Sequence, residues 1–129
     1  MRKKVLVVDD DKVITMALKI RLSAAGYDMN SAEDGISALQ SVQEKKPDVI
    51  LLDVRMPGMD GFEVNRRLKA LPELSYVPVI FLSAHAQEAT RQGALAAGAK
   101  YFLAKPYDAA QLITVIEAVT GEAGRAAID

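Results

Sequence analysis

The chain contains the run Val49-Ile50-Leu51-Leu52-Asp53, in which four large apolar residues are followed directly by an acid. A short, branched, apolar run of this kind is typical of a strand that is buried on both faces of a parallel sheet. Three further runs share the pattern, at Val5–Val8, Val79–Leu82 and Tyr101–Ala104. The sequence therefore predicts four buried strands. A fifth, half-exposed edge strand is predicted at Tyr27–Ser31, where apolar and polar residues alternate.

Segments with helical spacing separate the predicted strands. The first is expected to end at Gly26, and the second to begin at the N-cap Asp34 and to end before Pro47. The apolar positions expected on these two helices are Val13, Met16, Ala17 and Ile20 on the first, and Ile36 and Leu39 on the second. Each set has the three-to-four-residue spacing of one helix face.

Three more helices are expected further along the chain. The third follows Asp60-Gly61, the fourth spans roughly 88–97, and the fifth begins after Pro106 with Asp108 as its cap. The residues expected to face the core are Phe62, Val64 and Leu68 in the third helix, and Leu112, Val115, Ile116 and Val119 in the fifth. Strand and helix thus alternate five times, which favours an α/β fold with a parallel sheet and helices on both faces.

The length of 129 residues fits one domain, which we place at residues 1–120. Residues 121–129 are expected to form a flexible tail or the stub of a linker. The chain has no cysteine, which excludes disulfides, thiolate metal sites and a thiol nucleophile. The formal net charge of −1 does not suggest direct nucleic-acid binding. The basic start is followed by only four apolar residues, too few for a signal peptide or a membrane span, so a cytoplasmic protein without a membrane contact is expected.

Polar side chains follow the central strands at the point where each strand ends. The first strand is followed by Asp9-Asp10-Asp11, the others by Asp53, Ser83 and Lys105. In an open parallel sheet, ligands bind outside the carboxyl ends of the strands, near the place where the strand order reverses. Asp11 is read as a helix N-cap. The remaining acids, the hydroxyl and the ammonium are expected to form one site.

This set of residue types suits the transfer of a phosphoryl group. Clustered carboxylates raise one another's pKa unless a cation joins them, and oxygen ligands in an incomplete cage suit Mg²⁺. A lysine, a hydroxyl and a metal ion together stabilise the charge of a transferring phosphoryl group, and a carboxylate remains as the nucleophile. The Pro57-Gly58 pair after Asp53 fits the centre of a type II turn, which could fix the neighbouring backbone.

The chain resembles the receiver domain of two-component response regulators, including stand-alone chemotaxis-type regulators. The resemblance extends from about Lys4 to Val119, and each motif is short, but their order and spacing are specific. The matching motifs are Val7-Val8-Asp9-Asp10, Leu51-Leu52-Asp53, Met56-Pro57-Gly58-Met59-Asp60-Gly61, Leu82-Ser83-Ala84, Gly98-Ala99 and Lys105-Pro106-Tyr107. The resemblance implies a flavodoxin-like strand order of 2-1-3-4-5.

The resemblance also implies roles for the acids. Asp53 is expected to take a phosphoryl group from the phosphohistidine of a sensor kinase or a phosphotransfer protein. Asp10 and Asp53 are expected to bind Mg²⁺, with Asp9 helping directly or through water, and the main-chain carbonyl of Arg55 as a further ligand. Such a protein catalyses its own modification and is no turnover enzyme. Its downstream effector is unknown, and a phosphorylation-dependent homodimer is a further expectation.

The remaining roles implied by the resemblance concern the response to phosphorylation. Lys105 is expected to pair with the phosphate, Ser83 to act as the switch hydroxyl, and Phe102 to turn inward. The face formed by the helix at 88–97, the strand at Tyr101–Ala104 and the fifth helix is expected to change as a result. The Lys105–Pro106 peptide bond is expected to be cis. Arg55 and His85 flank the expected path of the hydrolytic water and predict a long-lived phosphoryl group, although both are equally compatible with solvated surface side chains.

Three other classes of protein fit these residues less well. A hydrolase of the haloacid dehalogenase kind would have a second acid two residues after the nucleophile, where this chain has Arg55. A receiver-shaped interaction module that never accepts phosphate would lack the acceptor, an acid or the lysine, all of which are present. A nucleotide- or flavin-binding fold would need a glycine-rich loop after the first strand, and this chain has aspartates there.

Overall fold

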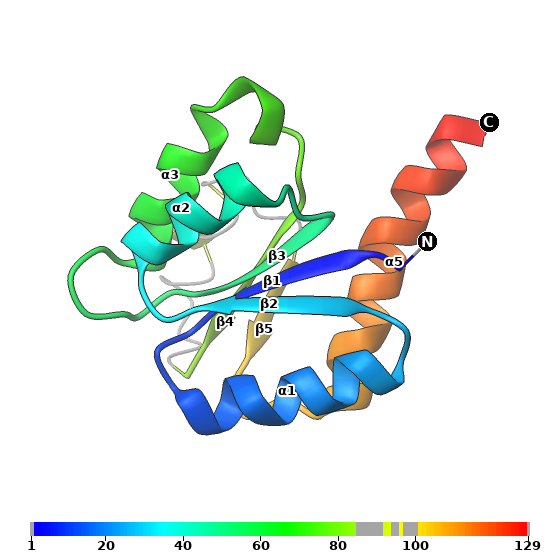
Figure 1. The fold of residues 1–129 in the computed structure, drawn as a ribbon, viewed down its shortest axis with the longest axis horizontal. Helices are drawn as coiled ribbons and strands as arrows, with labels where there is room; N and C mark the ends of the chain where they lie inside the picture. The colour runs from blue at the N-terminus through cyan, green and yellow to red at the C-terminus, as the bar shows by residue number, and fades with distance from the viewer. Residues whose placement is uncertain (1, 85–91, 94–95, 97–100, 129) are drawn as a thin grey trace.

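A computed structural model describes residues 2–84, 92–93, 96 and 101–128. Five parallel strands form one sheet in the order β2-β1-β3-β4-β5 (Figure 1), which confirms the predicted fold class and strand order. The strands are β1 (Lys4–Val8), β2 (Asp28–Ala32), β3 (Val49–Asp53), β4 (Val79–Ser83) and β5 (Tyr101–Ala104). Each lies within one residue of its predicted position.

Helices cover both faces of the sheet (Figure 1). The α-helices are α1 (Lys12–Ala24), α2 (Gly35–Glu44), α3 (Gly61–Lys69) and α5 (Ala109–Ile128), and a short 3₁₀-helix spans Pro72–Leu74. α2 and α3 lie on one face, and α1 and α5 on the other. The helix predicted at 88–97 lies largely outside the described residues. In the described part of the chain, no helix is both long enough and apolar enough to cross a membrane.

The sheet separates two apolar layers, because successive side chains of a strand point to opposite faces. In β3, Ile50 and Leu52 join the layer under α2 and α3, whereas Val49 and Leu51 join the layer under α1 and α5. All five residues of β3 and of β4 are buried. The central strands are therefore held in place by packing on both faces of the sheet. This packing also fixes the position of the residues at their carboxyl ends.

Aspartate side chains begin the helices as the sequence predicts. Asp11, Asp34 and Asp108 each accept hydrogen bonds from backbone N–H groups in the first turn of the helix that follows, as N-caps do. Asp60 does the same for α3. Gly26, with φ of 96°, follows the end of α1 at the expected place.

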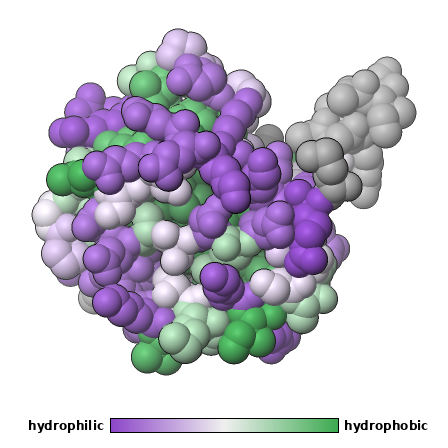
Figure 2. Space-filling view, viewed as in Figure 1, coloured by the Kyte–Doolittle hydropathy of each residue, from purple (hydrophilic) through white to green (hydrophobic). Residues whose placement is uncertain are grey.

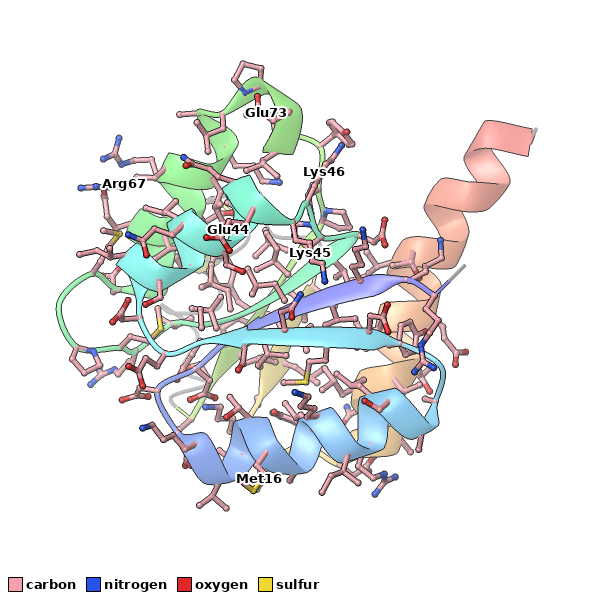
Figure 3. All side chains as sticks on the ribbon, viewed as in Figure 1. Met16, Glu44, Lys45, Lys46, Arg67 and Glu73 are labelled. Carbon is pink, nitrogen blue, oxygen red and sulfur yellow. The ribbon has the colours of Figure 1, made fainter. Side chains whose placement is uncertain are left out.

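The predicted buried stripe of α1 is wrong. Val13, Met16 and Ile20 are 79%, 68% and 67% exposed, and Ala17 is exposed as well. α1 instead buries Leu18 and Leu22. Figure 3 shows Met16 pointing away from the sheet, and Figure 2 shows hydrophobic atoms at the surface over this helix. Several apolar side chains of α1 thus face solvent.

The other helices follow the predictions more closely. α2 buries Ala38 and Val42, while Leu39 is partly buried and Ile36 is 64% exposed, contrary to the expectation for Ile36. The core positions of the remaining helices are as predicted for Val64, Leu68, Leu112, Ile116 and Val119, with Phe62 and Val115 partly buried. α5 continues to Ile128, beyond the expected end of the domain at residue 120. The flexibility predicted for 121–129 stays a prediction.

Candidate functional site

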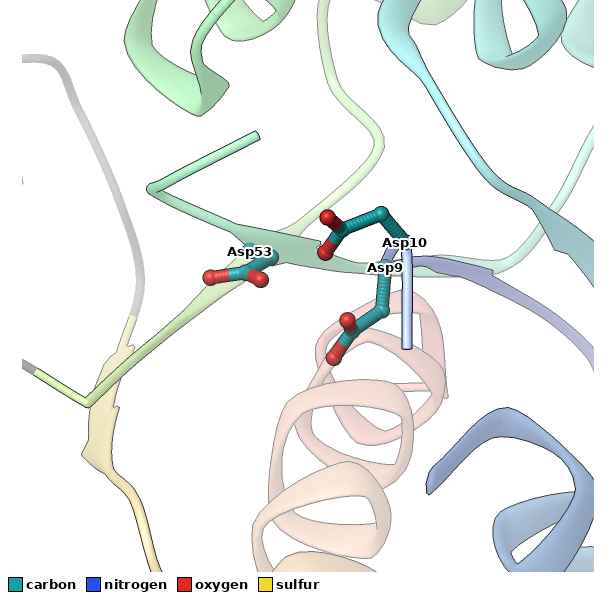
Figure 4. Close-up of side chains that lie close together, drawn as sticks. All are labelled: Asp9, Asp10 and Asp53. Atoms are coloured by element: carbon teal, nitrogen blue, oxygen red, sulfur yellow. The ribbon is translucent and has the colours of Figure 1, made fainter. Parts of the chain in front are cut away.

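Three carboxylates gather where β1 and β3 end. Asp9 follows β1 and Asp53 is the last residue of β3, and these two strands are neighbours in the sheet. Oxygen atoms of Asp9, Asp10 and Asp53 all lie within 4.8 Å of one another (Figure 4). Asp9 and Asp53 are buried, whereas Asp10 is exposed. The strand order reverses between β1 and β3, so the acids lie at the switch point where α/β sheets bind ligands.

Lys105 reaches this cluster from the residue directly after β5. Its Nζ donates to Asp9 Oδ2 at 2.9 Å and to Asp53 Oδ2 at 3.3 Å. The Lys105 side chain is 15% exposed, and those of Asp9 and Asp53 are 1% and 8% exposed. One ammonium therefore compensates two buried carboxylates, as buried charges require.

Backbone groups hold the two buried acids in place. The N–H of Asp11 donates to Asp9 Oδ1 at 2.9 Å, and the N–H of Arg55 donates to Asp53 Oδ1 at 3.3 Å. Each of these carboxylates thus has one oxygen bound to the backbone and the other bound to Lys105. Another cation could therefore take the place of the Lys105 ammonium at the Oδ2 atoms while the backbone hydrogen bonds to the Oδ1 atoms keep both side chains oriented toward the site.

The charges at the site shift the pKa values of its groups. Burial raises the pKa of Asp53; Lys105 opposes this, Asp9 adds to it, and the net direction is upward. Burial alone would lower the pKa of Lys105, but its hydrogen bond to Asp9 and the charges of both acids raise it overall. The charged form of Asp53 is therefore disfavoured in this structure. A cation placed between the acids would relieve that cost.

Gly61 permits the close approach of α3 to the end of β3. A Cβ atom on Gly61 would lie 2.3 Å from the Asp53 carbonyl oxygen and 2.9 Å from Val54 Cα. The Gly61 N–H donates to the Val54 carbonyl at 2.9 Å, which ties the start of α3 to the end of β3. Gly58 has φ of 78°, as the predicted type II turn requires of its third residue.

The structure places the other predicted site residues as follows. Ser83 is fully buried at the end of β4, and its carbonyl accepts from the Lys105 N–H at 2.7 Å. Phe102 lies on β5 and packs in part against the layer under α2 and α3. The Lys105–Pro106 peptide bond is cis, as predicted. Arg55 is exposed and lines an open cavity of about 600 Å³ with Pro57 and Phe62. His85 lies outside the described residues.

The donor set fits a hard divalent cation. Three carboxylates within 4.8 Å supply oxygen ligands at one side and leave the rest of the coordination sphere to water or a phosphate, as Mg²⁺ prefers. Asp9, Asp10 and Asp53 are the side chains that could hold such an ion. The structure thus brings together the predicted acids and Lys105 and places Ser83 on the neighbouring strand end.

Sequence reasoning gave no role to the Tyr107 side chain. It follows Lys105 and Pro106 and lines an open groove of about 610 Å³ that Lys105 also lines. The Lys-Pro-Tyr stretch marks the position, but no sequence signal shows that its hydroxyl is buried.

Comparisons with known proteins agree with this geometry. The family model of the response regulator receiver domain matches residues 5–117. Response regulator PleD of Caulobacter vibrioides is 40% identical over 120 residues, which cover 93% of this chain and 26% of PleD. Transcriptional regulatory protein CseB of Streptomyces coelicolor is 41% identical over 122 residues, covering 95% of this chain and 51% of CseB. The chain thus spans about a quarter to a half of these relatives.

Solved structures share the fold. The chemotaxis response regulator CheY4 of Vibrio cholerae superposes with a TM-score of 0.87 at 33% identity, covering 92% of this chain and 99% of CheY4. The receiver domain of a signal transduction histidine kinase from Syntrophus aciditrophicus gives a TM-score of 0.85 at 30% identity, with 93% and 91% covered. The chain belongs to the response regulator receiver domain family, and its fold is that of the chemotaxis-type receivers.

Proposed function

We propose that this chain is a phospho-accepting signalling switch in which Asp53 takes a phosphoryl group in a Mg²⁺-dependent reaction. The phosphoryl donor is the phosphohistidine of a sensor histidine kinase or of a phosphotransfer protein. The observation that supports the proposal is the buried Asp53 carboxylate, which lies beside Asp9 and Asp10 and 3.3 Å from the Lys105 ammonium. We place this reaction in the cytoplasm.

The chemical step forms one bond and breaks another. An Asp53 Oδ atom attacks the phosphorus as the phosphorus–nitrogen bond to the donor imidazole breaks, and the imidazole leaves with the electron pair. When bound, Mg²⁺ neutralises charge on the phosphoryl oxygens. Asp9, Asp10, Asp53 and the Arg55 carbonyl are its proposed ligands. The Arg55 N–H, which donates to Asp53 Oδ1, holds the nucleophile in a defined orientation.

The other site residues respond to the negative charge of the phosphoryl group on Asp53. Lys105 and Ser83 pair with the phosphoryl oxygens, and Phe102 moves with them, which changes the output face formed by the helix predicted at 88–97, β5 and α5. Phosphorylation can bias such a two-state element only through contacts that differ between its states. The chain catalyses its own phosphorylation and dephosphorylation and turns over no metabolite. We also propose that the phosphorylated chain forms a homodimer and acts on a downstream effector.

The exposed face of α1 supplies a docking surface for the phosphodonor protein. Val13, Met16 and Ile20 recur at helical spacing and face solvent, while the groove lined by Ile14 and Leu18 on the same helix extends to Lys105. A helical partner that covers this stripe would therefore be placed next to the reacting centre. α1 also contains Lys12, Lys19 and Arg21 and no acid, so the complementary partner surface is apolar with an acidic border.

A charge placed on that stripe separates docking from chemistry. Met16→Glu should lower phosphotransfer from a phosphorylated histidine kinase by about tenfold or more, because a buried unpaired charge opposes association. Phosphorylation by a small phosphodonor should be unchanged. Ile36→Glu, at an exposed position on α2, is the matched control and should change neither rate. Equal loss with both donors would contradict the docking role.

Arg55 and His85 are proposed to slow hydrolysis of the acyl phosphate by shielding it from water. Arg55→Ala and His85→Ala should shorten the phosphoryl lifetime, measured from the loss of radioactive phosphate. Rapid hydrolysis that neither substitution changes would refute this role.

The central proposal is tested with a small phosphodonor and Mg²⁺. Mass spectrometry of the intact chain should show one phosphoryl adduct, stable in acid and labile in base, on Asp53. Asp53→Asn should abolish the adduct, since an amide cannot act as this nucleophile. Asp48→Asn, at the opposite edge of the sheet, is the control and should leave it in place. An adduct that persists in Asp53→Asn would exclude Asp53 as the acceptor. No adduct in the unsubstituted chain would exclude the phospho-acceptor function and favour a receiver-like interaction module.

A further inference from the structure

The Tyr107 hydroxyl is buried and has no hydrogen-bond partner among the described residues. The ring packs against the layer under α1 and α5, so a phenylalanine would make the same apolar contacts. Buried hydroxyl groups are rarely left unpaired, because an unmade hydrogen bond costs free energy. Packing therefore does not explain why this position has a hydroxyl. A partner that becomes available in another state of the protein would explain it.

The charged site lies within electrostatic reach of this hydroxyl. Tyr107 and Lys105 line the same groove. Burial raises the pKa of the Tyr107 phenol, Lys105 lowers it, and Asp9 and Asp53 raise it further, with a net upward direction. The phenol is therefore neutral at physiological pH, and its oxygen can both donate and accept a hydrogen bond.

The Lys105 ammonium would have to change partners if a cation bound the acids. It has three N–H donors, and among the described residues it donates to Asp9 and Asp53. Both partners belong to the candidate cation site. Once these carboxylates hold a divalent ion, their charge is compensated and the ion repels the ammonium. Lys105 then needs another acceptor or it turns toward solvent.

We propose that Tyr107 is a positioning residue whose hydroxyl accepts a hydrogen bond from Lys105 when Asp9 and Asp53 bind a divalent cation. The bond keeps the ammonium next to Asp53, ready for a phosphoryl group, and gives the buried hydroxyl its partner. The same bond favours the cation-bound state, because it lowers the free energy of a displaced Lys105. This inference rests on the proposed cation site, and it adds a residue that acts through Lys105.

The test compares Tyr107→Phe with the unsubstituted chain in the absence of any phosphodonor. Titration with Mg²⁺ alone, followed by calorimetry, should show an affinity about tenfold weaker in Tyr107→Phe, the range expected for loss of one hydrogen bond to a charged group. The midpoint of thermal unfolding without metal should be equal or higher, since the hydroxyl removed is unpaired. Tyr27→Phe changes a tyrosine of the same apolar layer at the other end of the sheet and should leave the Mg²⁺ affinity unchanged.

A double-mutant cycle with Lys105→Met distinguishes positioning from general packing. In the Lys105→Met background, Tyr107→Phe should no longer change the Mg²⁺ affinity. An equal loss in that background, an unchanged affinity in the unsubstituted background, or a lower unfolding midpoint without metal would each overturn the role of Tyr107. If the unsubstituted chain binds no Mg²⁺ at all, the proposed function fails as well, so the two failures are distinguishable.

Discussion

The two ends of the parallel sheet hold ion pairs of similar length in opposite environments. At the carboxyl end, Lys105 lies 2.9 Å from Asp9, with side chains 15% and 1% exposed. At the amino end, Arg2 lies 3.1 Å from Asp28, with side chains 49% and 58% exposed. The exposed pair is screened by water, whereas the buried acids depend on Lys105 for a counter-charge. Distance alone therefore does not show which pair matters; burial does.

Substitution of one glycine at each end of the sheet tests the same difference and gives the largest expected effect on stability. Gly61→Ala, at the carboxyl end, places a Cβ 2.3 Å from the Asp53 carbonyl, so the start of α3 or the end of β3 must move. We expect a loss of about 3 kcal/mol in the free energy of unfolding and a large loss of Mg²⁺ affinity. Urea unfolding and calorimetric titration measure the two quantities.

Gly26→Ala is the matched substitution at the amino end. Gly26 has φ of 96° but open space around it, so alanine adds backbone strain without a clash. The expected cost is about 1 kcal/mol, with an unchanged Mg²⁺ affinity. Comparable loss of metal binding in both variants would mean that the close approach of Gly61 does not position Asp53.

Removal of the cation from each pair gives the next effect. Lys105→Met leaves Asp9 and Asp53 buried without a counter-charge, and we expect a loss of about 1–2 kcal/mol at pH 7, reduced from the value for a fully buried pair because water reaches part of the site. Arg2→Ala should cost less than about 1 kcal/mol. Urea unfolding at low and high salt checks both. If the stability loss caused by Lys105→Met depended strongly on salt while the loss caused by Arg2→Ala did not, the assignment of the Lys105 pair as the buried one would be contradicted.

The pH dependence of cation binding gives the smallest effect. Burial raises the pKa of Asp53, so the folded chain takes up this proton at a higher pH than the unfolded chain does. As the pH falls through that raised pKa, protonation of Asp53 adds to the stability of the metal-free protein and removes a cation ligand. Calorimetry from pH 7.5 to pH 5 should show a declining Mg²⁺ affinity, with a shallower decline in Asp53→Asn.

The helices show where periodicity was sufficient and where it was not. In α3 the predicted core positions Val64 and Leu68 are buried, while Arg66 and Arg67 on the outer face pair with Glu63. α1 has apolar residues on two faces, and spacing alone cannot say which one meets the sheet. The wrong face was predicted because the choice depends on how β1 and β2 place the helix.

The site was predictable to the extent that each residue is fixed by a strand end. Asp9, Asp53, Ser83 and Lys105 all lie at carboxyl ends of parallel strands, which must share one edge. The missing partner of the Tyr107 hydroxyl could not be predicted. Whether one buried oxygen has a partner depends on atoms contributed by several elements.

The sequence by itself determined the alternation of strands and helices, the edge at which the polar groups gather and the family. These follow from local apolar runs, from caps and from the rule that parallel strands end at a common edge. Only the tertiary structure decided that Lys105 bonds to Asp9, 96 residues away, that α1 turns Met16 to solvent, and that the Tyr107 hydroxyl is enclosed. Such contacts join distant segments, and their distances and burial arise only when the whole core packs.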